Sequence, residues 1–225
     1  MLITGHSRGL GAALSELLQA QGHHVMGLSS QELNLASPQA VARFVQTDQL
    51  TIFFTMASQA VLINNAGRLL PVGINGTLNS QEILDTINVN VSSALAITNA
   101  FLAATQHCKD RRIAQISSGA ARSPYAGWSV YCASKAALDQ HARCIALEAI
   151  PGLRIESIAP GIIDTEMQGQ VRATTIEQFP MRPKFDKLKA QGALASPQSV
   201  AQKLWAHLMS ERFGCETCTD LRQIG

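Results

Sequence analysis

The sequence has few features of a membrane, secreted or nucleic-acid-binding protein. No unbroken run of about 18 apolar residues occurs, so we expect no transmembrane helix. An apolar strand-like segment begins at Leu2, which leaves no room for a signal peptide. The net charge of +2 gives no strong attraction to nucleic acid or to a membrane surface. We therefore expect a cytoplasmic protein that binds neither.

Cysteine is also scarce. The five cysteines are an odd number, which argues against a disulfide framework. Cys215 and Cys218 form a single Cys-x-x-Cys, and a zinc site would need two more ligands. We predict no metal site, and we interpret this pair as an accident of a late strand or loop.

Strand-like apolar segments alternate with amphipathic helical segments along the chain. Its 225 residues suit a single domain over 1–225, and a hydrophobic share of 46% is enough for a sizeable core. Such alternation predicts an α/β fold, with a Rossmann-like, doubly wound parallel sheet flanked by helices. We expect helices at about 10–21, 38–45, 81–106, 131–149 and 200–209, and a strand at 153–159.

A glycine-rich turn joins the first strand to the first helix. Gly5 permits a tight turn, Gly9 lets the backbone approach a pyrophosphate, and Gly11 lets the helix pack closely on the strand. The helix N-terminus supplies free N–H donors for phosphate. The alternative is an ordinary glycine turn. The run is Leu2-Ile3-Thr4-Gly5-His6-Ser7-Arg8-Gly9-Leu10-Gly11.

Tyr131 and Lys135 are four residues apart on a predicted helix. Residues at this spacing share a helix face, so the ammonium of Lys135 can lie beside the phenol of Tyr131. A neighbouring cation lowers the pKa of a tyrosine from its usual ~10. A tyrosine tuned in this way can transfer a proton near neutral pH. Such pairs also arise by chance on solvated helices.

Four motifs in one order resemble the short-chain dehydrogenase/reductase family, in its compact single-domain form. The resemblance runs from about residue 2 to the helix near 197–209. It implies hydride transfer between a nicotinamide cofactor and a small-molecule carbonyl or alcohol. The motifs are Thr-Gly-x-x-x-Gly-x-Gly from Thr4, Asn64-Asn65-Ala66-Gly67, Ser118 with Tyr131-x-x-x-Lys135, and Pro160-Gly161 followed by Thr165.

The resemblance implies a catalytic role for four residues. Tyr131 would be the general acid for ketone reduction or the base for alcohol oxidation. Lys135 would lower the pKa of Tyr131 and bind the nicotinamide ribose. Ser118 would donate to the substrate oxygen, and Asn90 would hold a water on a proton relay. Ser117 is a rival to Ser118 for the first of these two roles, and Asn88 is a rival to Asn90 for the second.

The same resemblance implies a set of cofactor contacts. Thr165 would touch the nicotinamide carboxamide, and Asn34 with Leu35 would wall the adenine. Besides Tyr131 and Lys135, the expected contacts are Gly5, Ser7, Arg8, Gly9, Leu10, Ser29, Asn34, Leu35, Asn65, Ala66, Gly67, Pro160, Gly161, Ile163 and Thr165.

The residues after the second strand predict the type of dinucleotide. NAD-selective sites carry an acidic residue there, which binds the ribose 2′-hydroxyl. Here Leu28 is followed by Ser29 and Ser30, with no carboxylate in the expected place. Arg8 can pair with a 2′-phosphate, and in the family a basic residue at this position goes with NADP. We therefore predict NADP(H) in preference to NAD(H).

Two segments depart from the family pattern. The connection between the second strand and residues 32–35 is too short for a crossover helix, so we expect that helix to be missing and the third strand to be vestigial. The apolar segment 49–58 either extends the preceding helix or forms a buried turn. These departures keep open a dinucleotide-binding sensor or interaction protein without turnover. A sugar-nucleotide epimerase is a weaker alternative, because such relatives usually have another glycine spacing and a longer C-terminal domain.

Two further expectations concern the surface of the protein. Residues 166–195 carry apolar side chains among polar ones and are expected to form a substrate lid, with simple surface packing as the alternative. The helices at 81–106 and 131–149 are rich in alanine, which permits close helix contact. In the family the equivalent pair forms an interface, so we predict a homodimer or homotetramer.

Overall fold

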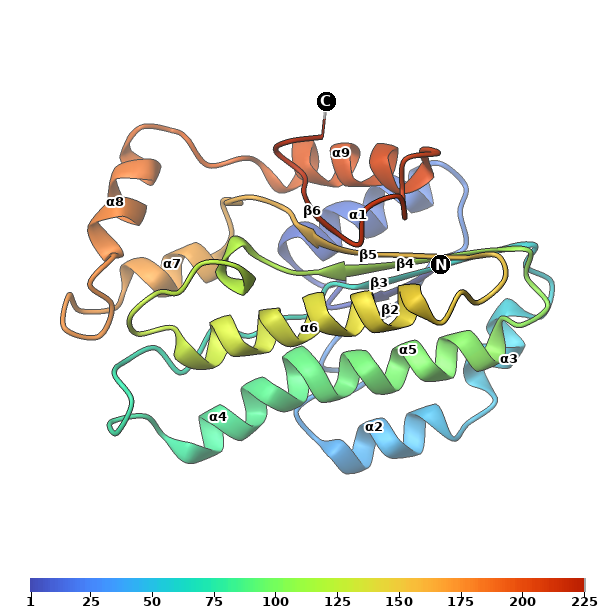
Figure 1. The fold of residues 1–225 in the computed structure, drawn as a ribbon, viewed down its shortest axis with the longest axis horizontal. Helices are drawn as coiled ribbons and strands as arrows, with labels where there is room; N and C mark the ends of the chain where they lie inside the picture. Colours follow the sequence, from blue (N-terminus) through green and yellow to red (C-terminus); the bar gives the residue numbers. More distant parts are fainter. Residues whose placement is uncertain (225) are drawn as a thin grey trace.

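A six-stranded sheet forms the centre of the computed structural model, which describes residues 1–224 (Figure 1). The strand order is β2-β1-β3-β4-β5-β6, and every adjacent pair is parallel. The predicted doubly wound α/β class is confirmed. The strands are β1 (Leu2–Thr4), β2 (Met26–Leu28), β3 (Gln59–Asn64), β4 (Asp110–Ile116), β5 (Leu153–Ala159) and β6 (Cys218–Asp220).

Helices cover both faces of the sheet. Helices α1 and α9 lie on one face, and α2, α5 and α6 lie on the other (Figure 1). The helices are α1 (Gly9–Ala20), α2 (Pro38–Val45), α3 (Gln49–Phe54), α4 (Ser80–Ile87), α5 (Ser93–Ala104), α6 (Ser129–Leu147), α7 (Glu166–Arg172), α8 (Arg182–Ala190) and α9 (Pro197–Met209).

The core consists of two apolar layers, one on each face of the sheet. Successive strand residues point to opposite faces, so Leu2 joins the layer with α5 and α6, while Ile3 joins the layer with α1 and α9. Leu62 and Ile63 divide in the same way. Both faces are covered, which explains why these strands are apolar at consecutive positions.

The connection after β2 contains no strand. Backbone bonds from Leu33 N to Ser29 O (2.9 Å) and from Ser37 N to Asn34 O (3.1 Å) fold this segment into turns that lead directly into α2. The expected missing helix is thus confirmed, whereas the vestigial strand at 32–35 is wrong. Backbone N–H and C=O groups of these turns bond to one another and do not pair with β2, so β2 remains the edge of the sheet.

The apolar segment 49–58 forms α3, a separate short helix. Leu50 and Phe54 on its inner side are buried, and the ring of Phe54 meets that of Phe101 on α5 edge-on at 5.4 Å. The segment therefore extends the core next to α5 and does not prolong α2.

The predicted helix at 81–106 is continuous over Ser80–Ala104, but it contains a π-helical turn at Asn88–Ser92. A π turn inserts an extra residue into a helix and is frequent at functional sites. Within residues 1–224, this is the one helix long and apolar enough to span a membrane by length and composition, a test that buried core helices also pass. Its residues Ile97 and Phe101 lie in the core on the sheet.

Candidate active site

A cleft of about 1150 Å³ opens at the carboxyl ends of the strands. It lies where the chain order reverses, since β1 is flanked by β2 on one side and β3 on the other, and ligands of open α/β sheets bind at such a point. All the predicted cofactor contacts line it: Gly5, Ser7, Arg8, Gly9, Leu10, Ser29, Asn34, Leu35, Asn65, Ala66, Gly67, Tyr131, Lys135, Pro160, Gly161, Ile163 and Thr165.

The glycine-rich turn has the geometry expected of a phosphate cradle. Gly5 and Gly9 have φ angles of +69° and +56°, which side chains other than glycine rarely adopt. A Cβ atom on Gly11 would lie 2.1 Å from the carbonyl oxygen of Gly5. No side chain caps the N-terminus of α1, so its first amides are available to an anion. These residues fit a dinucleotide pyrophosphate.

Asn65 holds the glycine-rich turn against the end of β3. Its Nδ2 atom donates to the carbonyl oxygens of Thr4 and Gly5, each at 3.0 Å. In return, Oγ1 of Thr4 accepts bonds from the backbone nitrogens of Asn65 (3.1 Å) and Ala66 (3.0 Å). Asn65 is thus a brace within the cleft, and Thr4 is a partner that the sequence analysis did not select.

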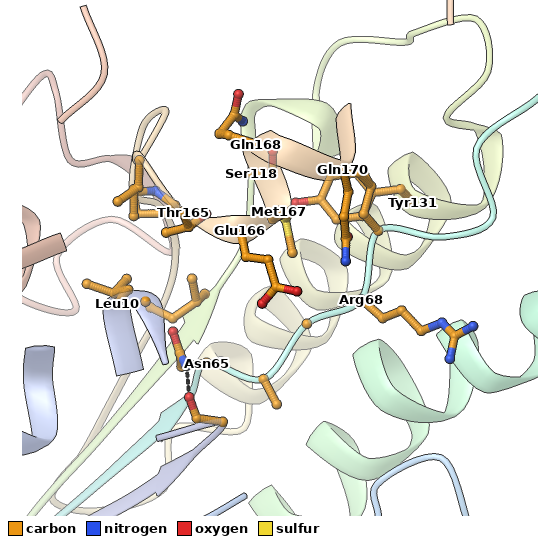
Figure 2. A pocket seen from close by; sticks show the side chains of 18 of the residues that line it. Leu10, Asn65, Arg68, Ser118, Tyr131, Thr165, Glu166, Met167, Gln168 and Gln170 are labelled. Atoms are coloured by element: carbon orange, nitrogen blue, oxygen red, sulfur yellow. Dashed lines mark hydrogen bonds between the residues drawn. The ribbon is translucent and has the colours of Figure 1, made fainter. Parts of the chain in front are cut away.

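Ser118, Tyr131 and Lys135 come together at the inner end of the cleft. Tyr131 and Lys135 lie on the first turns of α6 and are both buried. The ammonium of Lys135 donates to the carbonyl oxygen of Ile116 at 2.7 Å and lies 5.8 Å from the centroid of the Tyr131 ring. Figure 2 shows Ser118 next to Tyr131, with side chains of α7 beside them. The predicted triad is therefore assembled.

The electrostatics of the triad differ from the sequence expectation. Burial raises the pKa of Tyr131 to about 12, although a hydrogen bond with Ser118 lowers it. Burial also lowers the pKa of Lys135 to about 8, against the attraction of Asp139, which raises it. Burial therefore acts on the pKa of Tyr131 in the direction opposite to the lowering predicted from the neighbouring Lys135. Tyr131 keeps its proton throughout the physiological range.

Asn90 lies behind the cleft, at the π-helical turn, and is buried. Its Oδ1 accepts from the backbone nitrogen of Arg68 (2.7 Å), and its Nδ2 donates to the carbonyl oxygen of Arg68 (2.8 Å) and to Oγ of Ser134 (2.9 Å). These bonds occupy the amide, so the side chain braces the cleft wall against α6. The rival Asn88 donates to the carbonyl oxygen of Ala36 at 3.2 Å.

The two serines at the end of β4 have different partners. The hydroxyl of Ser117 donates to Oδ1 of the buried Asp139 at 2.7 Å. Ser118 instead caps the short turn Gly119–Ala121 and lies next to Tyr131. The geometry favours Ser118 over its rival. Asp139 was missed from the sequence, although its spacing of four from Lys135 places both on one face of α6.

An aromatic wall closes the cleft on the side of α7 and α8. It consists of Tyr125, Trp128 and Phe185, which line the cleft, and the fully buried Phe179 packs on Trp128. The rings of Trp128 and Phe179 are stacked at 4.3 Å with an interplanar angle of 9°, and Phe185 lies 5.4 Å from Trp128. Residues of the predicted lid line the cleft as well, namely Glu166, Met167, Gln168, Gln170, Val171, Lys184 and Phe185.

At the other end of the cleft, beside β2, the structure differs from the expectation that no carboxylate follows the second strand. A carboxylate does lie at the end of β2, because Glu32 folds back and its Oε2 accepts from the backbone nitrogen of Ser29 (2.7 Å) and from the Ser29 hydroxyl. The turn that replaces the missing strand brings Glu32 there. Arg8 does not reach toward Ser29; its Nη1 donates to Oε2 of Glu166 at 2.5 Å.

The cysteines and other metal-ligating side chains form no cluster in the part of the chain that the structure describes. No group of three or more His, Cys, Asp or Glu residues is placed to hold a metal there. Cys215 is exposed, and Cys218 begins β6.

Comparisons with known proteins show the family of the chain. The model of the short chain dehydrogenase family matches residues 1–176. The chain is 31% identical to a benzil reductase ((S)-benzoin forming) of Bacillus cereus, over 95% of each chain. It is 38% identical to the sepiapterin reductase of Mus musculus over 68% of this chain and 59% of that one.

A solved structure shares both sequence and fold with this chain. A short-chain dehydrogenase/reductase from Burkholderia vietnamiensis is 33% identical, covers 100% of this chain with 97% of its own, and superimposes with a TM-score of 0.69. Membership of one family accounts for the ordered motifs, the glycine-rich cradle and the cluster of Ser118, Tyr131 and Lys135. The chain belongs to the short-chain dehydrogenase/reductase family and is an NAD(P)-dependent oxidoreductase.

Proposed function

We propose that the protein is an NADP(H)-dependent carbonyl reductase in which Tyr131 is the general acid. The observation that carries this proposal is the buried phenol of Tyr131 beside Ser118 in the cleft, and burial raises the pKa of this phenol to about 12. A phenol that keeps its proton at neutral pH suits proton donation to a developing alkoxide. Alcohol oxidation would instead need the phenolate, which burial disfavours.

Each group of residues in the cleft has its own role in the proposed reaction. The glycine-rich turn binds the pyrophosphate, and Lys135 binds the nicotinamide ribose. Ser118 and Tyr131 donate hydrogen bonds to the substrate carbonyl oxygen and stabilise the negative charge that develops there. Tyr131 then transfers its proton to that oxygen. When bound, the nicotinamide supplies the hydride.

We propose an aromatic ketone as the substrate class. Support comes from the aromatic side chains of Tyr125, Trp128 and Phe185, which line the cleft, because flat rings pack favourably against such side chains. The similarity to a benzil reductase points the same way, since benzil carries two aryl ketones. Residues 166–195 would act as the lid that covers this substrate.

NAD(H) is the second candidate cofactor, and Glu32 favours it. Its carboxylate beside Ser29 resembles the acidic group that accepts the ribose 2′-hydroxyl in NAD sites. NADP(H) is supported by Arg8 in the glycine-rich turn, which is a suitable partner for a 2′-phosphate.

The reduction of benzil, with NADPH consumption followed by absorbance, tests the function. We expect kcat/KM for benzil to exceed that for a short aliphatic ketone by at least about 10², because only the aryl ketone packs on the wall. Tyr125→Ala, which truncates a partly exposed ring of the cleft lining, should lower kcat/KM for benzil and leave the aliphatic ketone nearly unaffected. Equal kcat/KM values for both ketones would contradict the substrate class, and no turnover of any ketone would contradict the proposed reaction.

A further inference from the structure

One ion pair crosses the cleft where its two sides meet. Arg8, in the glycine-rich turn, pairs with Glu166 at the start of α7, with 2.5 Å between Nη1 and Oε2. The neighbouring residues are also close, since a Cβ atom on Gly9 would lie 3.2 Å from Cγ2 of the Thr165 side chain. Figure 2 shows the Glu166 side chain extending into the pocket.

Arg8 is the cation best placed for the adenosine end of a dinucleotide. The backbone nitrogen of Gly5 donates to the carbonyl oxygen of Leu28 at 2.7 Å, which fixes the glycine-rich turn beside the end of β2 and Ser29. Arg8 lies on that turn, and 71% of its side chain is exposed, so it is free to change rotamer.

The other cations that line the cleft are engaged or lie elsewhere. Arg68 faces Glu82 and Asp85, each at 3.5 Å, and Arg222 pairs with Asp220 at 2.5 Å. Lys135 belongs to the triad, and Lys184 lies on α8. Within residues 1–224, Arg8 is therefore the one lining cation on the glycine-rich turn.

We propose that Glu166 is a specificity-determining residue that competes with the 2′-phosphate of NADP(H) for Arg8. This inference rests on the proposed use of NADP(H). The guanidinium of Arg8 now points across the cleft to Glu166, and a rotamer that forms a bidentate contact with a 2′-phosphate beside Ser29 would give up this contact. The 2′-phosphate must therefore draw Arg8 away from Glu166, whereas NAD(H), which lacks this phosphate, leaves the ion pair in place.

The cost of breaking the pair sets the size of the effect. Both side chains are largely exposed, at 71% and 64%, and such pairs are weak. Removing the competitor should tighten NADPH binding by about two- to fivefold and change NADH binding much less. The ratio of the two dissociation constants is therefore the informative quantity.

Titration of the full-length protein with NADPH and NADH tests the proposal in a double-mutant cycle of wild type, Glu166→Gln, Arg8→Ala and the double variant. We expect Glu166→Gln to raise the preference for NADPH about two- to fivefold. We expect no such gain in the Arg8→Ala background, because no guanidinium remains to be released. Glu177→Gln, which removes an exposed carboxylate of the lid region outside the cleft lining, should leave the preference unchanged.

A second variant separates competition from simple charge repulsion. Glu32→Gln also removes a carboxylate near the adenosine end but does not release Arg8. Its effect on the preference should therefore persist in the Arg8→Ala background.

Different outcomes would overturn the Glu166 proposal and the proposed use of NADP(H). The Glu166 proposal is overturned if Glu166→Gln leaves the preference unchanged, or if its gain survives in Arg8→Ala. A wild type that binds NADH and not NADPH overturns the NADP(H) proposal itself, and the competition falls with it.

Discussion

The guanidinium of Arg122 lies 2.9 Å from the carboxylate of Asp139, measured from Nε to Oδ2. The other oxygen of Asp139 accepts from the hydroxyls of Ser117 (2.7 Å) and Ser157 (2.6 Å). Ser117 precedes Ser118, and Arg122 ends the short turn that follows it. One buried carboxylate on α6 therefore holds the chain on both sides of Ser118.

Asp139→Asn should weaken both the fold and catalysis. The amide cannot replace the charge that faces Arg122, and the carboxylate is buried although one third of the Arg122 side chain is exposed, so we expect a loss of about 1–3 kcal/mol in the free energy of unfolding. We expect kcat to fall at least about tenfold, because Ser118 loses its fixed position. Urea unfolding and steady-state kinetics measure the two effects. Asp186→Asn, which breaks an exposed pair with Arg182, is the control and should cost under about 1 kcal/mol.

Lys135→Met should stabilise the fold while abolishing turnover. Burial lowers the pKa of Lys135 from 10.5 to about 8, so at neutral pH the folded protein bears the cost of a desolvated charge. Between pH 8 and 10.5 the unfolded chain retains a proton that the folded protein has released, so stability from this group rises with pH. We therefore expect a gain of about 1–3 kcal/mol at neutral pH, which shrinks as the pH rises through this window.

Urea titrations of the wild type and Lys135→Met at neutral pH and near pH 10 check this prediction. A variant that is less stable than the wild type at neutral pH would show that the bond from Lys135 to the carbonyl oxygen of Ile116 outweighs the desolvation cost.

Asn90→Ala should reduce kcat, because the cleft wall that Asn90 braces against α6 would shift. Without the amide, the backbone groups of Arg68 lose their partners, and the hydroxyl of Ser134 loses one donor. We expect kcat to fall about tenfold or more and the melting temperature to decrease, because buried polar groups are left unsatisfied. Asn88→Ala is the matched control on the same π-helical turn. Equal kinetics of the two variants would contradict the assignment of Asn90.

The two long helices should associate with a second copy of the chain. Leu84 on α4 and Leu147 on α6 are exposed by 57% and 85%, and burying such side chains favours association. We predict a homodimer or homotetramer in light scattering, and Leu147→Glu should shift it toward the monomer. A wild type that is monomeric at micromolar concentration would refute the prediction.

The sequence predicts the fold and the triad well, because the responsible patterns are local. The motifs follow apolar strands, and the ends of parallel strands meet at one edge of the sheet, so residues as distant as Gly9 and Thr165 converge. Tyr131 and Lys135 need only the period of a helix. The positions of these residues follow from spacing.

The errors concern features that depend on how the chain folds around the cleft. Arg8 and Glu166 are 158 residues apart, so their pairing depends on how α7 crosses the cleft. Glu32 reaches Ser29 only because the segment 29–36 folds into turns. The raised pKa of Tyr131 reflects burial, a tertiary property that the spacing of Tyr131 and Lys135 does not reveal.

The measurement that tests the central claim most directly is the reduction of benzil by NADPH with the wild type and Tyr131→Phe, together with nucleotide titration of both proteins. The account predicts that Tyr131→Phe lowers kcat at least about 10²-fold, the contribution typical of a general acid, and binds NADPH as tightly as the wild type. Turnover within about threefold of the wild type would contradict the role of Tyr131 as proton donor.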